Sequence, residues 1–308
     1  MNSGNLKKNT SPETAMKRIF HRLDKLVQDP GFTSSFHDTA KGEVNKSSDR
    51  QFGLVYLDSL SFYYTTIGYH EKISGNHNYT LQNSKGFAHS QLAFEIEASD
   101  LFFMAANRRE YYPIGGEVCL MGFARAVSYG YLEIADWWAT QLQRIYSLNP
   151  EYLLSSLPDQ YLATHLLLIA RCWNQNRWAT QDEINSNLCI YEELWRSDQD
   201  EKGYLESLNE CASYHLNEAL NNDVSPFGMM PNGPYPLELL AWIGLYKKIR
   251  SINLAIPNHP LFQNQLVQHP IPMPQYADDW LEEIRARAQF FYGASWIGFE
   301  KPTSPRFQ

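Results

Sequence analysis

Histidine residues paired with acidic neighbours are the first candidates for chemistry in this chain. His37–Asp38 is a dipeptide that metal-dependent phosphohydrolases use, but such a site needs further His and Asp ligands from neighbouring helices. His89, His165 and His215 lie on predicted helices, scattered over more than a hundred residues. For each of them the residue type favours a hydrogen-bonded helix histidine over a metal ligand.

The known catalytic motifs are missing from the sequence. It contains no Walker A, G-x-G-x-x-G or G-x-S-x-G motif, so neither a phosphate-binding loop nor a hydrolase nucleophile elbow is indicated. His70–Glu71 is followed by Ser74 where a zinc metalloprotease would place its second histidine. We therefore predict no catalytic residue, metal or cofactor from motifs.

Carboxylates cluster at three places, namely Glu95 to Asp100, Glu192–Glu193 and Asp278 to Glu283. The last has the D-D-x-x-E spacing that can hold Mg²⁺ against a diphosphate when a second acidic motif lies on a facing helix. No such second motif is evident, and acidic residues are expected where a helix begins. A solvated helix face is the favoured interpretation, with a metal-dependent helical enzyme as the alternative.

Helical periodicity runs through most of the chain and predicts an all-α fold. An amphipathic helix begins at Ser11–Pro12 and keeps its apolar spacing to Val27. Gly31–Ser48 is predicted as a loop, Asn76–Ser84 as a turn and Ser251–Ile256 as a short strand candidate. Further helices are predicted at about 49–73, 85–109, 116–128, 131–146, 158–173, 180–196, 201–220, 236–249 and 276–291.

Short connections between these segments predict an irregular array of about ten antiparallel-packed helices in a single globular domain. No repeat of fixed period is present, so a regular solenoid is not supported. We expect residues 1–10 to be a flexible polar leader, 11–300 the helical domain and 301–308 a flexible tail.

Composition limits the classes of partner. The 308 residues carry a formal net charge of -8, which disfavours nucleic acid as a direct ligand and suits a basic partner protein. Hydrophobic residues make up 44% and aromatic residues 14%, enough for a large core, so the Trp residues are interpreted mainly as core. No signal peptide or membrane span is recognisable, and the four widely spaced cysteines favour reduced core residues, so we expect a cytoplasmic protein.

The segment from Tyr204 to His259 carries a distinctive order of features. A helix with a late histidine is followed by a polar break, a Pro-rich approach to an apolar helix, and a short extended piece. This order resembles the C-terminal part of the immunity 49 family of bacterial polymorphic-toxin immunity proteins, and EVCLMGFARAVSYGYLEIADWW at Glu117–Trp138 is similar to a helix pair of that family. The matching positions are Tyr204, Leu208, His215, Pro234, Pro236–Leu237 and Leu240–Ala241.

The resemblance covers roughly residues 88–259, and the part after Pro260 has no counterpart. It implies an all-helical protein, without catalytic residues or cofactor, that binds and neutralises one cognate toxin delivered by a type VI secretion or contact-dependent system. The toxin would be blocked at its active site or at another essential surface. A helical scaffold or adaptor without a toxin partner is the remaining alternative.

The stretch SPFGMMPNGPYPLELL holds the predicted toxin-binding residues. Its prolines fix the approach to the following helix, and Glu238 falls in the first turn of that helix, near the positive end of the dipole. Phe227, Met229 and Met230 precede the helix without a periodic partner. Adaptable methionines suit a protein-binding surface, or they fold back as a lid on the core. We therefore take Phe227, Met229, Met230 and Glu238 as the candidate toxin-binding residues.

Overall fold

The computed structural model describes residues 10–47, 52–107, 116–155, 157, 159–184, 188–197, 200–222, 225–228, 231–268 and 278–299. Over this part of the chain there are fifteen α-helices and no strand, which confirms the all-α prediction. The α-helices are α1 (Pro12–Gln28), α2 (His37–Lys46), α3 (Leu54–Ile73), α4 (Tyr79–Ala106), α5 (Gly116–Ser128), α6 (Leu132–Leu148), α7 (Pro150–Leu154), α8 (Gln160–Gln175), α9 (Gln181–Ile184), α10 (Glu192–Arg196), α11 (Glu201–Asn221), α12 (Leu237–Arg250), α13 (Pro260–Gln263), α14 (Gln265–Gln268) and α15 (Asp279–Tyr292).

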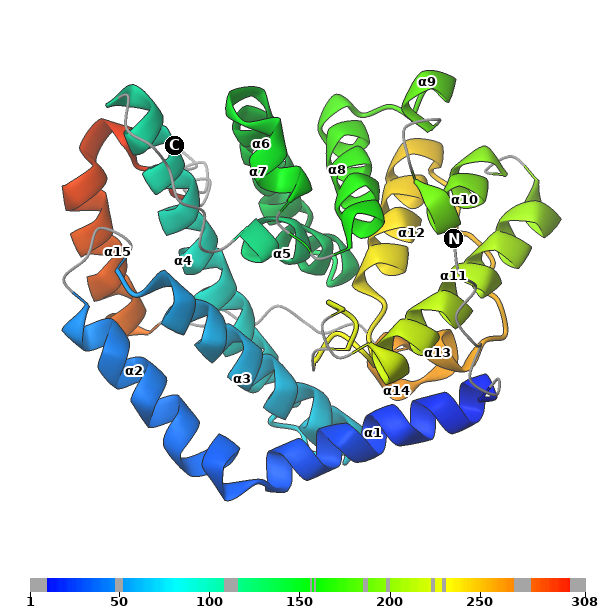
Figure 1. The fold of residues 1–308 in the computed structure, drawn as a ribbon, viewed down its shortest axis with the longest axis horizontal. Coiled ribbons are helices and arrows are strands. Elements are labelled where there is room, and N and C mark those ends of the chain that lie inside the picture. Colours follow the sequence, from blue (N-terminus) through cyan, green and yellow to red (C-terminus); the bar gives the residue numbers. More distant parts are fainter. Residues whose placement is uncertain are drawn as a thin grey trace, which may run out of the picture.

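The long helices α3 and α4 form the most extensive pair of the fold (Figure 1). Two glycines allow this close approach. A Cβ on Gly86 would lie 2.4 Å from the Thr65 hydroxyl oxygen, and one on Gly68 would lie 2.5 Å from the Asn83 side-chain nitrogen. Because any larger residue would push the helices apart, these two positions fix the spacing of the pair.

The other helices pack against this pair or against its neighbours (Figure 1). Helix α2 lies against α3 and α15 lies against α4, while α1 runs along one edge to reach α11. On the other side α5 contacts α6 and α12, and α8 lies between α6 and α12. Several helices that follow one another along the chain are also neighbours in space, among them α3 with α4 and α5 with α6.

Large aromatic residues fill the interior. Trp138, Trp173, Trp195 and Trp242 are all fully buried, which confirms the interpretation of these tryptophans as core. The Trp138 indole nitrogen donates a hydrogen bond to the Cys119 carbonyl oxygen at 2.9 Å, so its polar atom is satisfied within the core. The four cysteines are free thiols, and three of them are buried.

The prediction of a loop at Gly31–Ser48 was wrong. Gly31–Phe36 is a π-helical segment, labelled η1, and it continues directly into α2. Ser34 and Ser35 donate their hydroxyl hydrogens to carbonyl oxygens four residues back, at 2.5 and 2.8 Å, so polar side chains are accommodated within the helix. Phe32 and Val44 supply the buried face.

Three smaller predictions also needed correction. Helix α4 begins at Tyr79, inside the predicted Asn76–Ser84 turn, and Ser251–Ile256 is irregular rather than a strand. The predicted helix at 180–196 is broken into α9, a 3₁₀ turn (Cys189–Tyr191) and α10. Cys189 has φ of 50°, in the left-handed region that ends a helix.

Residues 1–9 and 301–308, where a flexible leader and tail were predicted, lie outside the described residues. Among the helices that are described, none has the length and apolarity to cross a bilayer.

Candidate functional site

The predicted site segment folds back onto α11. Phe227 and Glu238 are each 1% exposed, and the Phe227 ring centroid lies 4.4 Å from that of His215. His215 is held at both ring nitrogens: Nδ1 is 2.9 Å from Glu238 Oε1, and Nε2 is 3.0 Å from the Gly233 carbonyl oxygen. Because a carbonyl oxygen only accepts, Nε2 carries a proton.

This geometry corrects the assignment of Phe227 and Glu238 as surface contacts. Both side chains are in the interior and present no surface to a partner in this conformation. The prediction that Glu238 lies in the first turn of α12 is confirmed, but its carboxylate is used internally by His215. Met229 and Met230 lie outside the described residues, and their assignment as toxin-binding residues stays a prediction.

The histidines of the alternative enzyme hypothesis are only partly brought together. His37 Nε2 is 2.7 Å from the Tyr64 hydroxyl oxygen, and the His89 ring lies 5.1 Å from the Tyr64 ring. Burial lowers the pKa of His89 to about 4 and that of His165, in a separate part of the core, to about 3. Within the described ranges no three His, Cys, Asp or Glu side chains converge as metal ligands.

The acidic cluster at the start of α15 is used for capping and ion pairing. Asp278 accepts a hydrogen bond from the Trp280 backbone nitrogen at 2.9 Å and caps the helix. Glu282 pairs with Arg285, whose Nε donates at 2.9 Å to the fully buried Glu95 on α4. The described carboxylates of this cluster thus act at or within α15, and Arg285 links that helix to α4. The interpretation as a solvated helix face was wrong for Glu95, which is fully buried.

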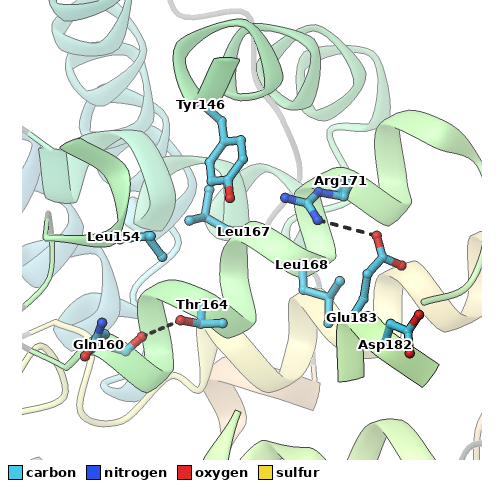
Figure 2. A pocket seen from close by; sticks show the side chains of 9 residues that line it. All are labelled: Tyr146, Leu154, Gln160, Thr164, Leu167, Leu168, Arg171, Asp182 and Glu183. Carbon is cyan, nitrogen blue, oxygen red and sulfur yellow. Dashed lines mark hydrogen bonds and ion pairs between the residues drawn. The ribbon is translucent and has the colours of Figure 1, made fainter. Parts of the chain in front are cut away.

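Two concave pockets lie along α8 and share one lining residue. The first, of about 510 Å³, lies between α6, α7, α8 and α9 (Figure 2). The second, of about 370 Å³, is bounded by α8 and α11, and both are lined by Gln160. We call the two together the α8 groove. Its lining consists of Tyr146, Leu154, Asp159, Gln160, Tyr161, Thr164, Leu167, Leu168, Arg171, Asp182, Glu183, Tyr214, Glu218, Asn222 and Ser225.

At one end of the groove, Glu183 is held in place by several hydrogen bonds. Its carboxylate accepts two hydrogen bonds from Arg177, both at 2.7 Å, and a third from the Thr180 backbone nitrogen at 2.9 Å. These donors, with Arg177 first among them, lower the pKa of Glu183 to about 2. Arg171, 3.4 Å from Glu183 and 5.1 Å from the Tyr146 ring centroid, completes this wall (Figure 2).

The other end of the groove is built on the N-terminus of α8. Asp159 caps the helix, since its Oδ1 accepts from the backbone nitrogens of Tyr161 and Leu162 at 2.9 and 3.1 Å. The Tyr214 hydroxyl donates to Asp159 Oδ2 at 3.1 Å. Phe227 packs edge-on against the Tyr214 ring, 6.3 Å between centroids. The residue predicted as a contact thus supports the wall of the groove from inside.

The groove combines acidic and aromatic side chains. Its lining holds four carboxylates, namely Asp159, Asp182, Glu183 and Glu218, against the single cation Arg171. Tyr146, Tyr161 and Tyr214 add rings with a polar tip, which is the residue type most favoured in protein-binding surfaces. The arrangement offers no nucleophile paired with a base, and it suits recognition of a cationic, partly apolar segment.

Sequence reasoning missed the groove because its two sides are far apart along the chain. The local signals were present, since Asp159 precedes a helix and Thr180 with Glu183 has the spacing of a capping box. These signals place helix ends but do not indicate that residues 146–183 meet residues 214–225.

Comparisons with known proteins give no support for a particular family. No family model matches the chain, and neither the curated proteins nor the solved structures give a significant match.

Proposed function

We propose that this protein is a stoichiometric inhibitor that binds and neutralises one bacterial toxin, as an immunity protein of the kind its sequence resembles. It would act in the cytoplasm of the producing cell, where an incoming toxin must be blocked at its active site or at another essential surface. The α8 groove is the proposed contact surface.

The acidic and aromatic lining of the groove is the observation that carries this proposal. Four carboxylates and three tyrosines line the two pockets, which share Gln160, in a chain of net charge -8. Opposite charge on a basic toxin would accelerate association, and the tyrosine rings supply rigid contact area. Tight inhibition needs about 800 Å² buried on each partner, so the contact extends beyond the groove onto neighbouring helices.

The direct test is co-expression with the toxin encoded by the adjacent gene. The proposal expects growth rescue, and it expects the purified proteins to form a complex of fixed stoichiometry. Rescue should be lost when groove carboxylates are reversed in charge and retained when carboxylates elsewhere are reversed. If a toxic neighbour kills the cells despite co-expression and no complex forms, the proposal is wrong.

A further inference from the structure

The contact between His215 on α11 and Glu238 on α12 requires a shared proton. His215 Nε2 donates to the Gly233 carbonyl oxygen at 3.0 Å, so the ring proton of a neutral imidazole is already at Nε2. Nδ1, 2.9 Å from Glu238 Oε1, would then present a lone pair to a carboxylate that has only lone pairs. A hydrogen bond between them needs a second proton, on Nδ1 or on Oε1. The pair therefore holds one proton more than a neutral histidine beside an ionised glutamate.

Burial makes this proton necessary for the contact. Both side chains are 1% exposed, and Glu238 Oε2 has no hydrogen-bond partner among the described residues. Without the shared proton, Oε1 would also lose its partner, and a buried carboxylate without hydrogen bonds is costly. Loss of the proton therefore breaks the contact between α11 and the first turn of α12.

The titratable groups that face this pair from the surrounding elements are uncharged between pH 7.5 and pH 8.5. Burial raises the pKa values of the Cys211 thiol and the Tyr191 hydroxyl, both of which lie close enough to Glu238 to be influenced by its charge. Burial lowers the pKa of His165 to about 3 and that of His259, which is close to His215, to about 4. In this window the pair is thus surrounded by neutral side chains.

The charged groups of the neighbouring helices have other contacts. On α1, Glu13 acts on His259, and Arg22 donates to two carbonyl oxygens at the C-terminal end of α11. On α3, burial lowers the pKa of Lys72 to about 8, and its Nζ donates to the Leu266 carbonyl oxygen at 2.9 Å. Lys72 titrates in the same window, so its effect has to be separated by comparing variants that all contain it.

The His215–Glu238 pair fixes the chain that supports the groove. It holds residues 231–236 by one of their carbonyl oxygens. Residues 225–228 pack on this piece, since the Asn232 side-chain nitrogen donates to one of their carbonyl oxygens at 3.2 Å. Phe227 in turn packs against the ring of Tyr214, which lines the groove. Opening of these two pieces therefore removes the support of the groove wall.

We propose that the His215–Glu238 pair is a pH-sensitive switch, which holds residues 225–228 and 231–236 against α11 at neutral pH and releases them as the pH rises. A solvated histidine has a pKa of about 6.5 and a solvated glutamate one of about 4.3, so above pH 7.5 the separated side chains bind almost no proton. Each opening then releases one proton, and the opening equilibrium constant rises about tenfold per pH unit. The consequence for the groove rests on the proposed toxin binding, whereas the switch itself does not.

Hydrogen–deuterium exchange of the isolated full-length protein, resolved by NMR at pH 7.5, 8.0 and 8.5, tests this inference. The reporters are the backbone amides of Tyr235 and Leu237, which donate to the carbonyl oxygens of Asn232 and Tyr235 at 3.1 and 2.8 Å. After correction for the intrinsic exchange rates, the opening constant of the wild-type protein should rise about tenfold from pH 7.5 to pH 8.5.

Glu238→Gln is the decisive variant. Its side-chain amide donates to Nδ1 without an additional proton, so both hydrogen bonds of His215 are kept and the opening constant should not change with pH. Glu206→Gln is the matched control, because it removes a largely exposed carboxylate from α11 and should retain the wild-type pH dependence. Lys72 is present in all three proteins, so its titration cancels in the comparison.

Two results would overturn the inference. The first is a wild-type opening constant that stays the same from pH 7.5 to pH 8.5, and this measurement decides the question even if Glu238→Gln fails to fold. The second is the same pH dependence in the wild-type protein and in folded Glu238→Gln. Because exchange is measured without toxin, failure of the switch is distinguishable from failure of the proposed function, which growth rescue reports.

Discussion

The imidazole of His215 lies 2.9 Å from the carboxylate of Glu238, and both side chains are 1% exposed. This contact joins α11 to the first turn of α12 across the proline-rich segment between them. The second ring nitrogen of His215 holds that segment by the Gly233 carbonyl oxygen. The His215–Glu238 pair therefore has a structural role, because it holds the proline-rich segment against the core.

Truncating either member of this pair should destabilise the protein. His215→Ala or Glu238→Ala leaves a buried polar group without its partner, which costs about 3–5 kcal/mol of unfolding free energy. Urea denaturation followed by circular dichroism measures this. A double replacement by leucine should be less destabilising than the sum of the two single changes. If the single variants unfold at the wild-type urea midpoint, the His215–Glu238 contact does not contribute to the unfolding free energy.

Reversing the charge of carboxylates in the groove should slow association with the toxin. Glu218→Lys and Asp182→Lys each place a cation opposite a basic partner, so the association rate constant should fall about tenfold at low ionic strength and less at high salt. Surface plasmon resonance with the cognate toxin measures these rates. Glu206→Lys is the matched control, since Glu206 is also on α11, is largely exposed and lies outside the groove. Equal losses in all three variants would contradict a groove-specific effect.

Much of the fold was predictable because its helices carry their own signals. The Gly116–Ser128 helix was predicted with its observed bounds, since an apolar run with Gly at one end and a Ser-Tyr-Gly turn at the other defines it. The segment from Gly31 was wrongly predicted as a loop because Thr and Ser hydroxyls can also donate to carbonyl oxygens within a helix. Whether the segment is helical depends on the burial of Phe32, which the local sequence does not show.

The candidate site was less predictable for a different reason. In an irregular segment, a residue that is exposed to a binding partner and one that is buried against the core have the same sequence pattern. Phe227 is buried and packs against Tyr214 in the wall of the groove. Only the tertiary arrangement of α8 against α11 shows that Asp159 and Tyr214 share one wall. Buried donors such as Arg125 Nε are likewise defined by their surroundings and not by residue type.

The link between α15 and α4 should depend on one cation. Glu95 is fully buried, and Arg285 donates to it at 2.9 Å, so Arg285→Ala should lower the unfolding free energy by about 3–5 kcal/mol. Glu282→Gln, which alters the exposed partner of the same arginine, should change it by less than about 1 kcal/mol. Thermal unfolding compares the two. Similar unfolding midpoints for both variants would show that the Arg285–Glu95 ion pair is not the main interaction that holds α15 against α4.

Stability should fall as the pH is lowered from about 6.5 towards 4. Burial lowers the pKa of His89, His165 and His259 to about 4, 3 and 4, so in this window the unfolded chain binds protons that the folded protein does not. Asp58, whose pKa is raised to about 6, acts in the opposite direction. We expect a net loss of about 5–6 kcal/mol between pH 7 and pH 4.5, measured by urea denaturation.

His89→Gln should flatten this pH dependence, because it removes one of the three groups. Glu183 does not interfere above pH 4.5, since its pKa of about 2 means that its contribution is lost only at lower pH. Constant stability from pH 7 to pH 4.5 would show that the buried histidines do not titrate as their surroundings require.

Hydrogen–deuterium exchange of the toxin complex tests the central claim most directly. If the α8 groove is the contact surface, toxin binding should slow exchange in the N-terminal half of α8, in α9 and at the C-terminal end of α11. Exchange in α2 and α15 should remain unchanged. Protection confined to α2 and α15, with unchanged exchange around the groove, would contradict the account.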